Sequence, residues 1–241
     1  MVDEKKPIFA HMEELRGRVL VSIASVAIFG VLSYIYAEKI LMLLARHAGH
    51  LVFISPQEAF LAYLKIALFG GLVLSAPVIL FNALRFVWVA FKKSEQSAFV
   101  LYFLSGVGFF ISGVIFAYFI VLPAAMKFLL GYASDFLSPC ISVSRYVNFS
   151  FFLILAFAMA FETPLVVLFL TRLGVVNASL LRRKRKYFIV GMFIVAAVLT
   201  PPDVITQILL ALPLIALYEI SVLLAGFIKK VADPAGGTDD S

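Results

Sequence analysis

One uninterrupted apolar stretch, AFVLYFLSGVGFFISGVIFAYFIVL, occupies Ala98–Leu122. Its 25 residues include no charged side chain. Crossing the hydrocarbon core of a bilayer takes roughly 20 apolar residues in a helix, because a thickness of about 30 Å is divided by a rise of 1.5 Å per residue. In lipid the backbone must form its hydrogen bonds within the segment, so a run of this length predicts a transmembrane helix.

Five further apolar stretches surround it. They are Val19–Ala37, Pro56–Leu84, Val147–Leu170, Tyr187–Leu199 and the run that begins after Asp203. With 63% hydrophobic and only 14% charged residues, the 241-residue chain carries more apolar surface than a soluble domain of this size buries. We therefore expect an all-α integral membrane protein with six transmembrane helices. Residues 1–230 are predicted to form a single membrane domain, and residues 231–241 a disordered tail.

The last two predicted spans are short. Tyr187–Leu199 holds 13 residues of apolar type, which is about 20 Å of helix and some 10 Å less than the usual hydrocarbon core. Glu219 interrupts the sixth apolar run after 15 residues, Val204–Tyr218. Two consecutive short spans predict local thinning of the bilayer beside them.

The basic residues predict the orientation in the membrane. Of the 20 Lys and Arg residues, fifteen fall in the N-terminal head, the C-terminal tail and the alternate loops between them, and five fall on the other side. Basic residues concentrate in cytoplasmic segments, so both termini are expected in the cytoplasm. This distribution accounts for the net charge of +6 without nucleic-acid binding.

Glu162 is the first candidate functional residue, because it lies inside the fourth predicted span. A carboxyl group at that depth costs at least ~2.5 kcal/mol, so it should face a protein interior or a wet cavity. Pro164 has no amide hydrogen to donate to the carbonyl of Ala160, which leaves an acceptor nearby. Glu162 is then either a functional polar site or a protonated side chain bonded to a neighbouring helix. One functional class is a secondary transporter or channel with Glu162 as its proton or cation site.

Acidic residues on the basic cytoplasmic side form a second candidate. Glu13, Glu14 and Glu95 lie among arginines and lysines. They are either ion pairs at the rim, worth less than ~1 kcal/mol each, or a carboxylate site for an arginine-bearing ligand. A carboxylate accepts two parallel hydrogen bonds from a guanidinium, a geometry that lysine does not reproduce.

Motifs of enzymes and metal sites are missing from the sequence. There is no glycine-rich phosphate loop and no nucleophile elbow, and His47 and His50 are expected as solvated surface side chains. The single cysteine, Cys140, excludes a disulfide within the chain and a multi-cysteine metal site. We expect no cofactor, no metal and no enzymatic activity.

Several short motifs resemble those of the TatC family, the core receptor of the twin-arginine protein translocase. In chain order they are HMEELRGR at 11–18, SPQEAF at 55–60, SAP at 75–77, Phe86, Glu95, FETP at 161–164 and TPPD at 200–203. The resemblance extends from about Pro7 to Lys229. One position departs from it: many relatives carry a proline where this chain has Val89, so the path of that loop is not set by the resemblance.

The resemblance implies a cupped arrangement of six helices in the cytoplasmic (inner) membrane and recognition of folded export cargo through a twin-arginine signal peptide. It implies that Glu14 and Glu95 bind the arginine pair, that Arg16 and Phe86 support this surface, and that Glu162 faces the concavity. The expected structural and outer-face positions are Pro77, Pro201, Pro202 and Asp203. The implied partners are the single-span subunits TatB and TatA and further copies of the chain itself.

Overall fold

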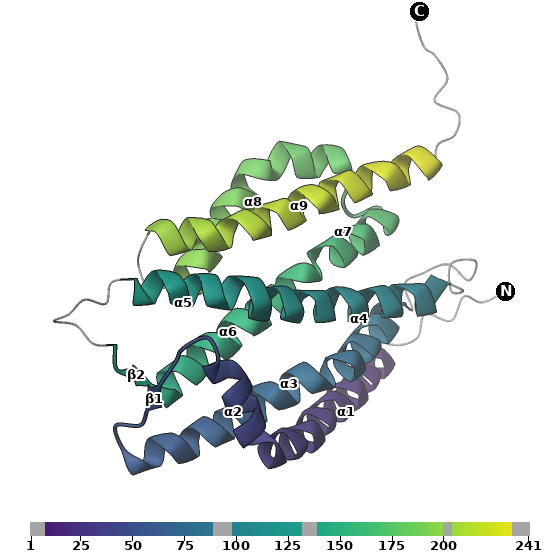
Figure 1. Ribbon diagram of the computed structural model, residues 1–241. Coiled ribbons are helices and arrows are strands. Elements are labelled where there is room, and N and C mark those ends of the chain that lie inside the picture. The colour runs from purple at the N-terminus through teal and green to yellow at the C-terminus, as the bar shows by residue number, and fades with distance from the viewer. Residues whose placement is uncertain (1–7, 89–97, 132–138, 200–203, 233–241) are drawn as a thin grey trace, which may run out of the picture. The chain divides into compact units, whose positions relative to one another are not determined.

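The computed structural model describes residues 8–88, 98–131, 139–199 and 204–232. Within these ranges the regular structure is helical, apart from two strands of two residues each, and turns connect the elements (Figure 1). The helices are α1 (Ile8–Ile35), α2 (Ala37–Ala45), α3 (Pro56–Trp88), α4 (Phe99–Phe116), α5 (Leu122–Leu130), α6 (Val143–Phe161), α7 (Thr163–Arg172), α8 (Ala178–Leu199) and α9 (Val204–Ala232). The strands are β1 (Leu51–Val52) and β2 (Ile141–Ser142).

Five helical segments in the described ranges are long and apolar enough to cross a membrane. They are Glu13–Ile35, Pro56–Trp88, Phe99–Leu130, Val143–Arg172 and Gln207–Phe227. The prediction of an all-helical, multi-pass membrane protein is therefore confirmed. The fifth predicted span, the short apolar part of α8, is not among these five segments, so a total of six crossings stays a prediction. The orientation of the termini and the cupped arrangement also stay predictions.

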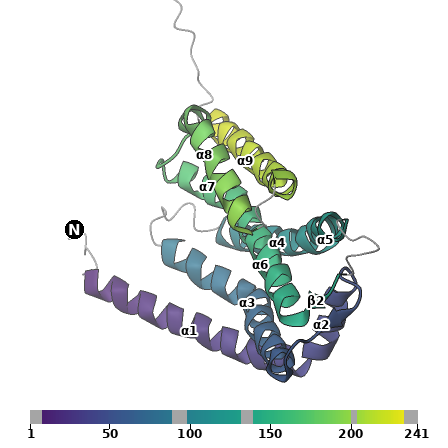
Figure 2. The same cartoon turned by 90° about the vertical axis from the view of Figure 1, so that its left-hand side faces the viewer.

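The chain divides into two compact units, of which the first comprises residues 1–108 and 129–155. The single membrane domain expected over residues 1–230 stays a prediction. In the first unit α1 and α3 run side by side (Figure 1 and Figure 2). Glycines allow this close approach, because a Cβ atom at Gly71 would lie 2.8 Å from the Cα atom of Gly30. A Cβ atom at Gly70 would lie 2.7 Å from the hydroxyl of Ser33.

The start of α3 is fixed by a proline and a carboxylate. The helix begins at Pro56, and the Glu58 carboxylate accepts a hydrogen bond of 2.8 Å from the amide of Ile54. The same carboxylate accepts hydrogen bonds from the Ser142 hydroxyl and, at 3.3 Å, from the Ser144 amide. Glu58 therefore also ties the start of α3 to the start of α6.

The segment before α3 is held by further contacts with the start of α6. β1 pairs in parallel with β2, with Leu51 opposite Ile141. The Tyr146 hydroxyl donates a hydrogen bond of 2.6 Å to the carbonyl of Leu44, near the end of α2. The helical spacing of Ile40, Leu41, Leu43 and Leu44 predicts a short helix over Glu38–Gly49, and α2 confirms it as far as Ala45.

The second unit comprises residues 109–128 and 156–241, and α7, α8 and α9 pack together within it. Its buried core consists of Val167, Leu181, Tyr218, Val222 and Ala225. The Tyr218 hydroxyl donates a hydrogen bond of 2.8 Å to the carbonyl of Leu181 and so connects α9 to α8.

Two of the predicted spans are interrupted near prolines. Between α4 and α5, residues Ala117–Val121 form a π-helical turn just before Pro123. The fourth predicted span is divided at Glu162, where α6 ends and α7 begins with Thr163 and Pro164. A proline removes an amide donor from the helical ladder, which explains both interruptions.

The prediction that the sixth span is short is wrong, because the segment Gln207–Phe227 of α9 is long and apolar enough to cross a membrane despite Glu219. Glu219 interrupts the apolar sequence, yet α9 continues past it to Ala232. Pro77 lies half-buried inside α3. Pro201, Pro202 and Asp203 lie outside the described residues, as does nearly all of the expected tail at 231–241.

Candidate functional site

Near the N-terminal end of α1 a carboxylate and a guanidinium form a pair. The Arg18 Nη2 atom lies 2.5 Å from the Glu14 Oε1 atom, to which it donates a hydrogen bond. The two residues are four apart on one helix, so they lie on the same face. The Arg18 side chain is 13% exposed and that of Glu14 is 38% exposed. The pair is thus partly withdrawn from solvent, which strengthens it relative to a fully exposed ion pair.

The same arginine reaches a second helix. Its Cζ atom lies 5.9 Å from the centroid of the Phe86 ring, near the end of α3. This distance is within the range of a cation–π contact. Glu14, Arg18 and Phe86 therefore form one cluster at the junction of α1 and α3.

Two of the four residues expected at the arginine-binding surface are thus brought together, Glu14 and Phe86. Arg16 is exposed and lies two residues from Glu14, which places it on nearly the opposite face of α1. Glu95 and Val89 lie outside the described residues.

The Glu14–Arg18 pair is the ion pair that the sequence left open as the alternative for Glu14, whereas the contact of Arg18 with Phe86 was not expected. The signal that identifies the pair is the spacing of four residues, which places an acid and a base on the same face of a helix.

An apolar cavity of about 560 Å³ adjoins this cluster between α1 and α3. Arg18 lies at its edge together with Leu15, Phe86 and Val87. The remaining lining residues are Val19, Ser22, Ile23, Val26, Leu72, Ile79, Asn82 and Ala83. Its polar groups are few, and the Asn82 amide donates a hydrogen bond of 3.2 Å to the Ser22 hydroxyl.

Glu162 lies at the break between α6 and α7. Its amide donates to the carbonyl of Met159 at 3.1 Å, and its carbonyl accepts from the amide of Val166 at 2.9 Å. Its Oε1 atom is buried and has no hydrogen-bond partner among the residues that the structure describes. A protonated Glu162 bonded to a neighbouring helix was one of the two interpretations. Among the described residues, its Oε1 atom forms no hydrogen bond of that kind.

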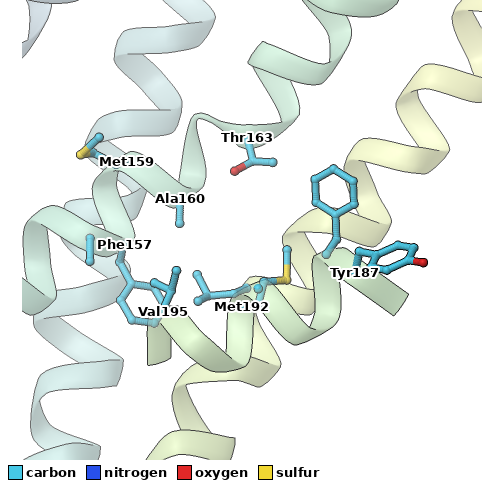
Figure 3. Close-up of a pocket in the computed structure, with 11 residues that line it drawn as sticks. Phe157, Met159, Ala160, Thr163, Tyr187, Met192 and Val195 are labelled. Atoms are coloured by element: carbon cyan, nitrogen blue, oxygen red, sulfur yellow. The ribbon is translucent and has the colours of Figure 1, made fainter. Parts of the chain in front are cut away.

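A second apolar cavity, of about 570 Å³, lies beside this break (Figure 3). Residues on either side of Glu162 line it, among them Ala160 and Thr163. The opposite wall comes from α8, with Tyr187 and Met192. The cavity is predominantly apolar, so it offers surface to hydrophobic side chains or acyl chains rather than to a polar solute.

The other membrane-embedded acid, Glu219, forms an ion pair with Arg185 and so connects α9 to α8. The Arg185 Nε atom donates to the Glu219 Oε1 atom at 2.5 Å. This hydrogen bond raises the pKa of Arg185 above its ordinary value. The pair explains Glu219 by a structural role.

Among the described residues no group of three His, Cys, Asp or Glu side chains could hold a metal ion.

Comparison with known proteins identifies the family of this chain. The sequence pattern of "Sec-independent protein translocase protein (TatC)" matches residues 10–213. The chain belongs to the TatC family. Its TatC relatives include the protein of Carboxydothermus hydrogenoformans, which is 36% identical over 95% of this chain and 96% of the relative. The TatC of Aquifex aeolicus is 38% identical over 90% of this chain and 94% of the relative.

A solved TatC structure has the same fold. The crystal structure of the twin-arginine translocase receptor TatC superposes with a TM-score of 0.82 at 38% identity. The match covers 89% of this chain and 97% of the other. TatC proteins are components of a protein translocase that works as a complex, which is a transport role and indicates no catalytic activity. Membership of the family does not favour the solute transporter or channel with Glu162 as its ion site.

Proposed function

We propose that this TatC-family protein binds the twin-arginine signal peptides of folded export cargo and organises the translocation complex around them. The observation that supports the proposal most directly is the cluster at the junction of α1 and α3. There the Glu14 carboxylate already holds a guanidinium, that of Arg18, beside the ring of Phe86. A site that accommodates an internal arginine in this way has the chemistry to accommodate an arginine from a ligand.

Two carboxylates give the site its selectivity for a pair of arginines. Glu14 and Glu95 are acids in a region where basic residues prevail, so a dibasic ligand finds its counter-charges there. Each carboxylate binds a guanidinium through two parallel hydrogen bonds, which an ammonium group does not match. In this proposal Phe86 supplies an aromatic face, and Arg16 supports the site from nearly the opposite face of α1, through its charge rather than by contact with Glu14.

Replacement of both acids tests the proposal. We expect Glu14→Ala combined with Glu95→Ala to abolish binding of a twin-arginine peptide to the purified full-length protein in nanodiscs, measured by fluorescence anisotropy. A Lys-Lys version of the peptide should bind poorly even to the unaltered protein. Glu13→Ala is the matched control, because Glu13 is exposed and its loss removes one negative charge from the same helix. Equal affinity for the Arg-Arg and Lys-Lys peptides would refute the bidentate argument.

The proposal extends to topology and partners. We infer six membrane crossings with both termini in the cytoplasm, in the cytoplasmic membrane, and assembly with single-span TatB and TatA subunits and further copies of the chain. The exposed apolar surface of α1 leaves room for a partner helix, because only 6% of the residues in its membrane window are buried within the chain. Such a surface is covered either by lipid or by a partner helix.

The remaining positions keep the roles that the resemblance implies. Glu162 is proposed as the polar residue that faces the concavity, and its buried Oε1 atom supports a polar role. Pro77, Pro201, Pro202 and Asp203 are proposed as structural and outer-face positions.

A further inference from the structure

The proposed arginine site contains an arginine of its own. Arg18 donates a hydrogen bond of 2.5 Å to the Glu14 carboxylate and packs against the Phe86 ring. Its side chain is only 13% exposed, and its Nη1 atom is buried without a hydrogen-bond partner among the described residues. The guanidinium is thus held at the carboxylate by two helices, although its own hydrogen-bonding capacity is not fully used.

A ligand that brings an arginine to Glu14 offers the carboxylate a guanidinium, the same group that Arg18 already supplies. Exchange of one guanidinium for another at the same carboxylate yields little net free energy, because similar hydrogen bonds are broken and formed. A tethered competitor is also present at an effective concentration in the millimolar range or higher. The ligand must therefore obtain its net binding free energy from a contact outside the Glu14 carboxylate.

We propose that Arg18 is a built-in competitor for the Glu14 carboxylate. It lowers the affinity of every ligand that fills this position by a common factor and makes occupancy depend on a second contact. This inference rests on the proposed function, in which the second arginine of the signal peptide supplies that contact. A single arginine is then held too weakly to occupy the site, and a bound signal peptide is released more readily.

The packing around Arg18 permits the exchange. The cavity of about 560 Å³ lies directly beside its side chain. The cavity leaves room for Arg18 to move without displacing packed atoms, and its apolar lining directs the released guanidinium toward solvent rather than into the cavity. Its guanidinium can keep the contact with the Phe86 ring while the carboxylate changes partners.

Peptide binding to Arg18→Gln tests the proposal. The full-length protein is placed in nanodiscs, and the affinities of Arg-Arg and Arg-Lys versions of one signal peptide are measured by fluorescence anisotropy. We expect Arg18→Gln to raise the affinity of the Arg-Arg peptide roughly three- to tenfold, as loss of a partly buried ion pair implies. Arg18→Lys keeps the charge but not the fork of donors, so a smaller rise is expected.

A double-mutant cycle with Glu14→Gln separates competition from a general charge effect. Competition at Glu14 predicts that Arg18→Gln has no effect on peptide binding once Glu14 is replaced. A long-range effect of net charge would persist in the Glu14→Gln background. Arg85→Gln is the matched control, since Arg85 is exposed and adjacent to Phe86, and it should change the affinity by less than about twofold.

The outcomes are distinct for the two proposals. If the unaltered protein binds the Arg-Arg peptide through Glu14 and neither Arg18 variant raises the affinity, the competitor role is wrong and the proposed function stands. A fall in affinity for both Arg18 variants would instead assign Arg18 a positioning role and overturn the inference. If the unaltered protein does not bind the peptide, the proposed function and this inference fail together.

Discussion

Single residues set the distance between α1 and α3. Gly71 and Gly30 bring the two backbones so close that a Cβ atom on either side meets main-chain atoms, which cannot rotate away as a side chain does. The cluster of Glu14, Arg18 and Phe86 spans the same pair of helices. The spacing of α1 and α3 therefore affects the proposed ligand site as well as the stability of the unit.

The first prediction concerns this spacing. Gly71→Ala should destabilise the protein by about 1–3 kcal/mol, because an added methyl group forces the backbones apart. Thermal unfolding in detergent should show this as a lower Tm. Gly108→Ala is the control, since nothing lies within 4 Å of a Cβ atom there, and the change should be neutral or slightly stabilising. Equal melting temperatures for the two variants would contradict the packing argument.

The local charge pattern singles out Glu14 as a candidate site residue, the family resemblance implies Phe86, and neither indicates Arg18. The acids are conspicuous because they oppose the local charge, whereas one more arginine among many is indistinguishable from topology-setting charge. The orphan Oε1 atom of Glu162 is likewise not predictable, since it depends on which side chains surround the break between α6 and α7.

Helices follow from the sequence more reliably than their interruptions and ends. Apolar runs of sufficient length predict α1, α3, α4, α6 and α9, and Pro56 predicts the first residue of α3. The extension of α8 back to Ala178 was not expected, although alanine, leucine, arginine and lysine all favour helix. The pairing of β1 with β2 was missed as well, because two-residue strands carry no periodicity.

The short apolar part of α8 gives a prediction at this scale. Insertion of five or six leucines after Tyr187 lengthens it toward the usual hydrocarbon thickness and should relieve the thinning of the bilayer. We expect export of a twin-arginine cargo to fall, measured in membrane vesicles, while peptide binding stays unchanged. An equal insertion after Leu104 in α4, a longer apolar helix, is the control for the insertion itself. Unimpaired export would dispose of the thinning hypothesis.

At the level of the whole molecule, two observations favour a receptor over a solute carrier. Membership of the TatC family indicates that the chain works as part of a translocase complex. The cavity beside Glu162 is apolar, which suits packing against helices or lipid better than passage of ions. Both observations favour a receptor whose transport activity needs other subunits.

The corresponding prediction compares the chain alone with the chain in its complex. Reconstituted alone in liposomes with a pH-sensitive dye, the protein should conduct no protons above the background of empty liposomes. Glu162→Gln should leave that background unchanged. In pull-down from membranes the same protein should retain a twin-arginine precursor. A proton flux that disappears in Glu162→Gln would instead support the transporter.

Site-specific photocrosslinking from positions 14 and 95 to a twin-arginine precursor tests the central claim most directly. We expect crosslinks from both positions in membranes, and their loss when the two arginines of the precursor are replaced by lysines. The claim is contradicted if neither position forms a crosslink, or if accessibility labelling places both positions on the outer side of the membrane.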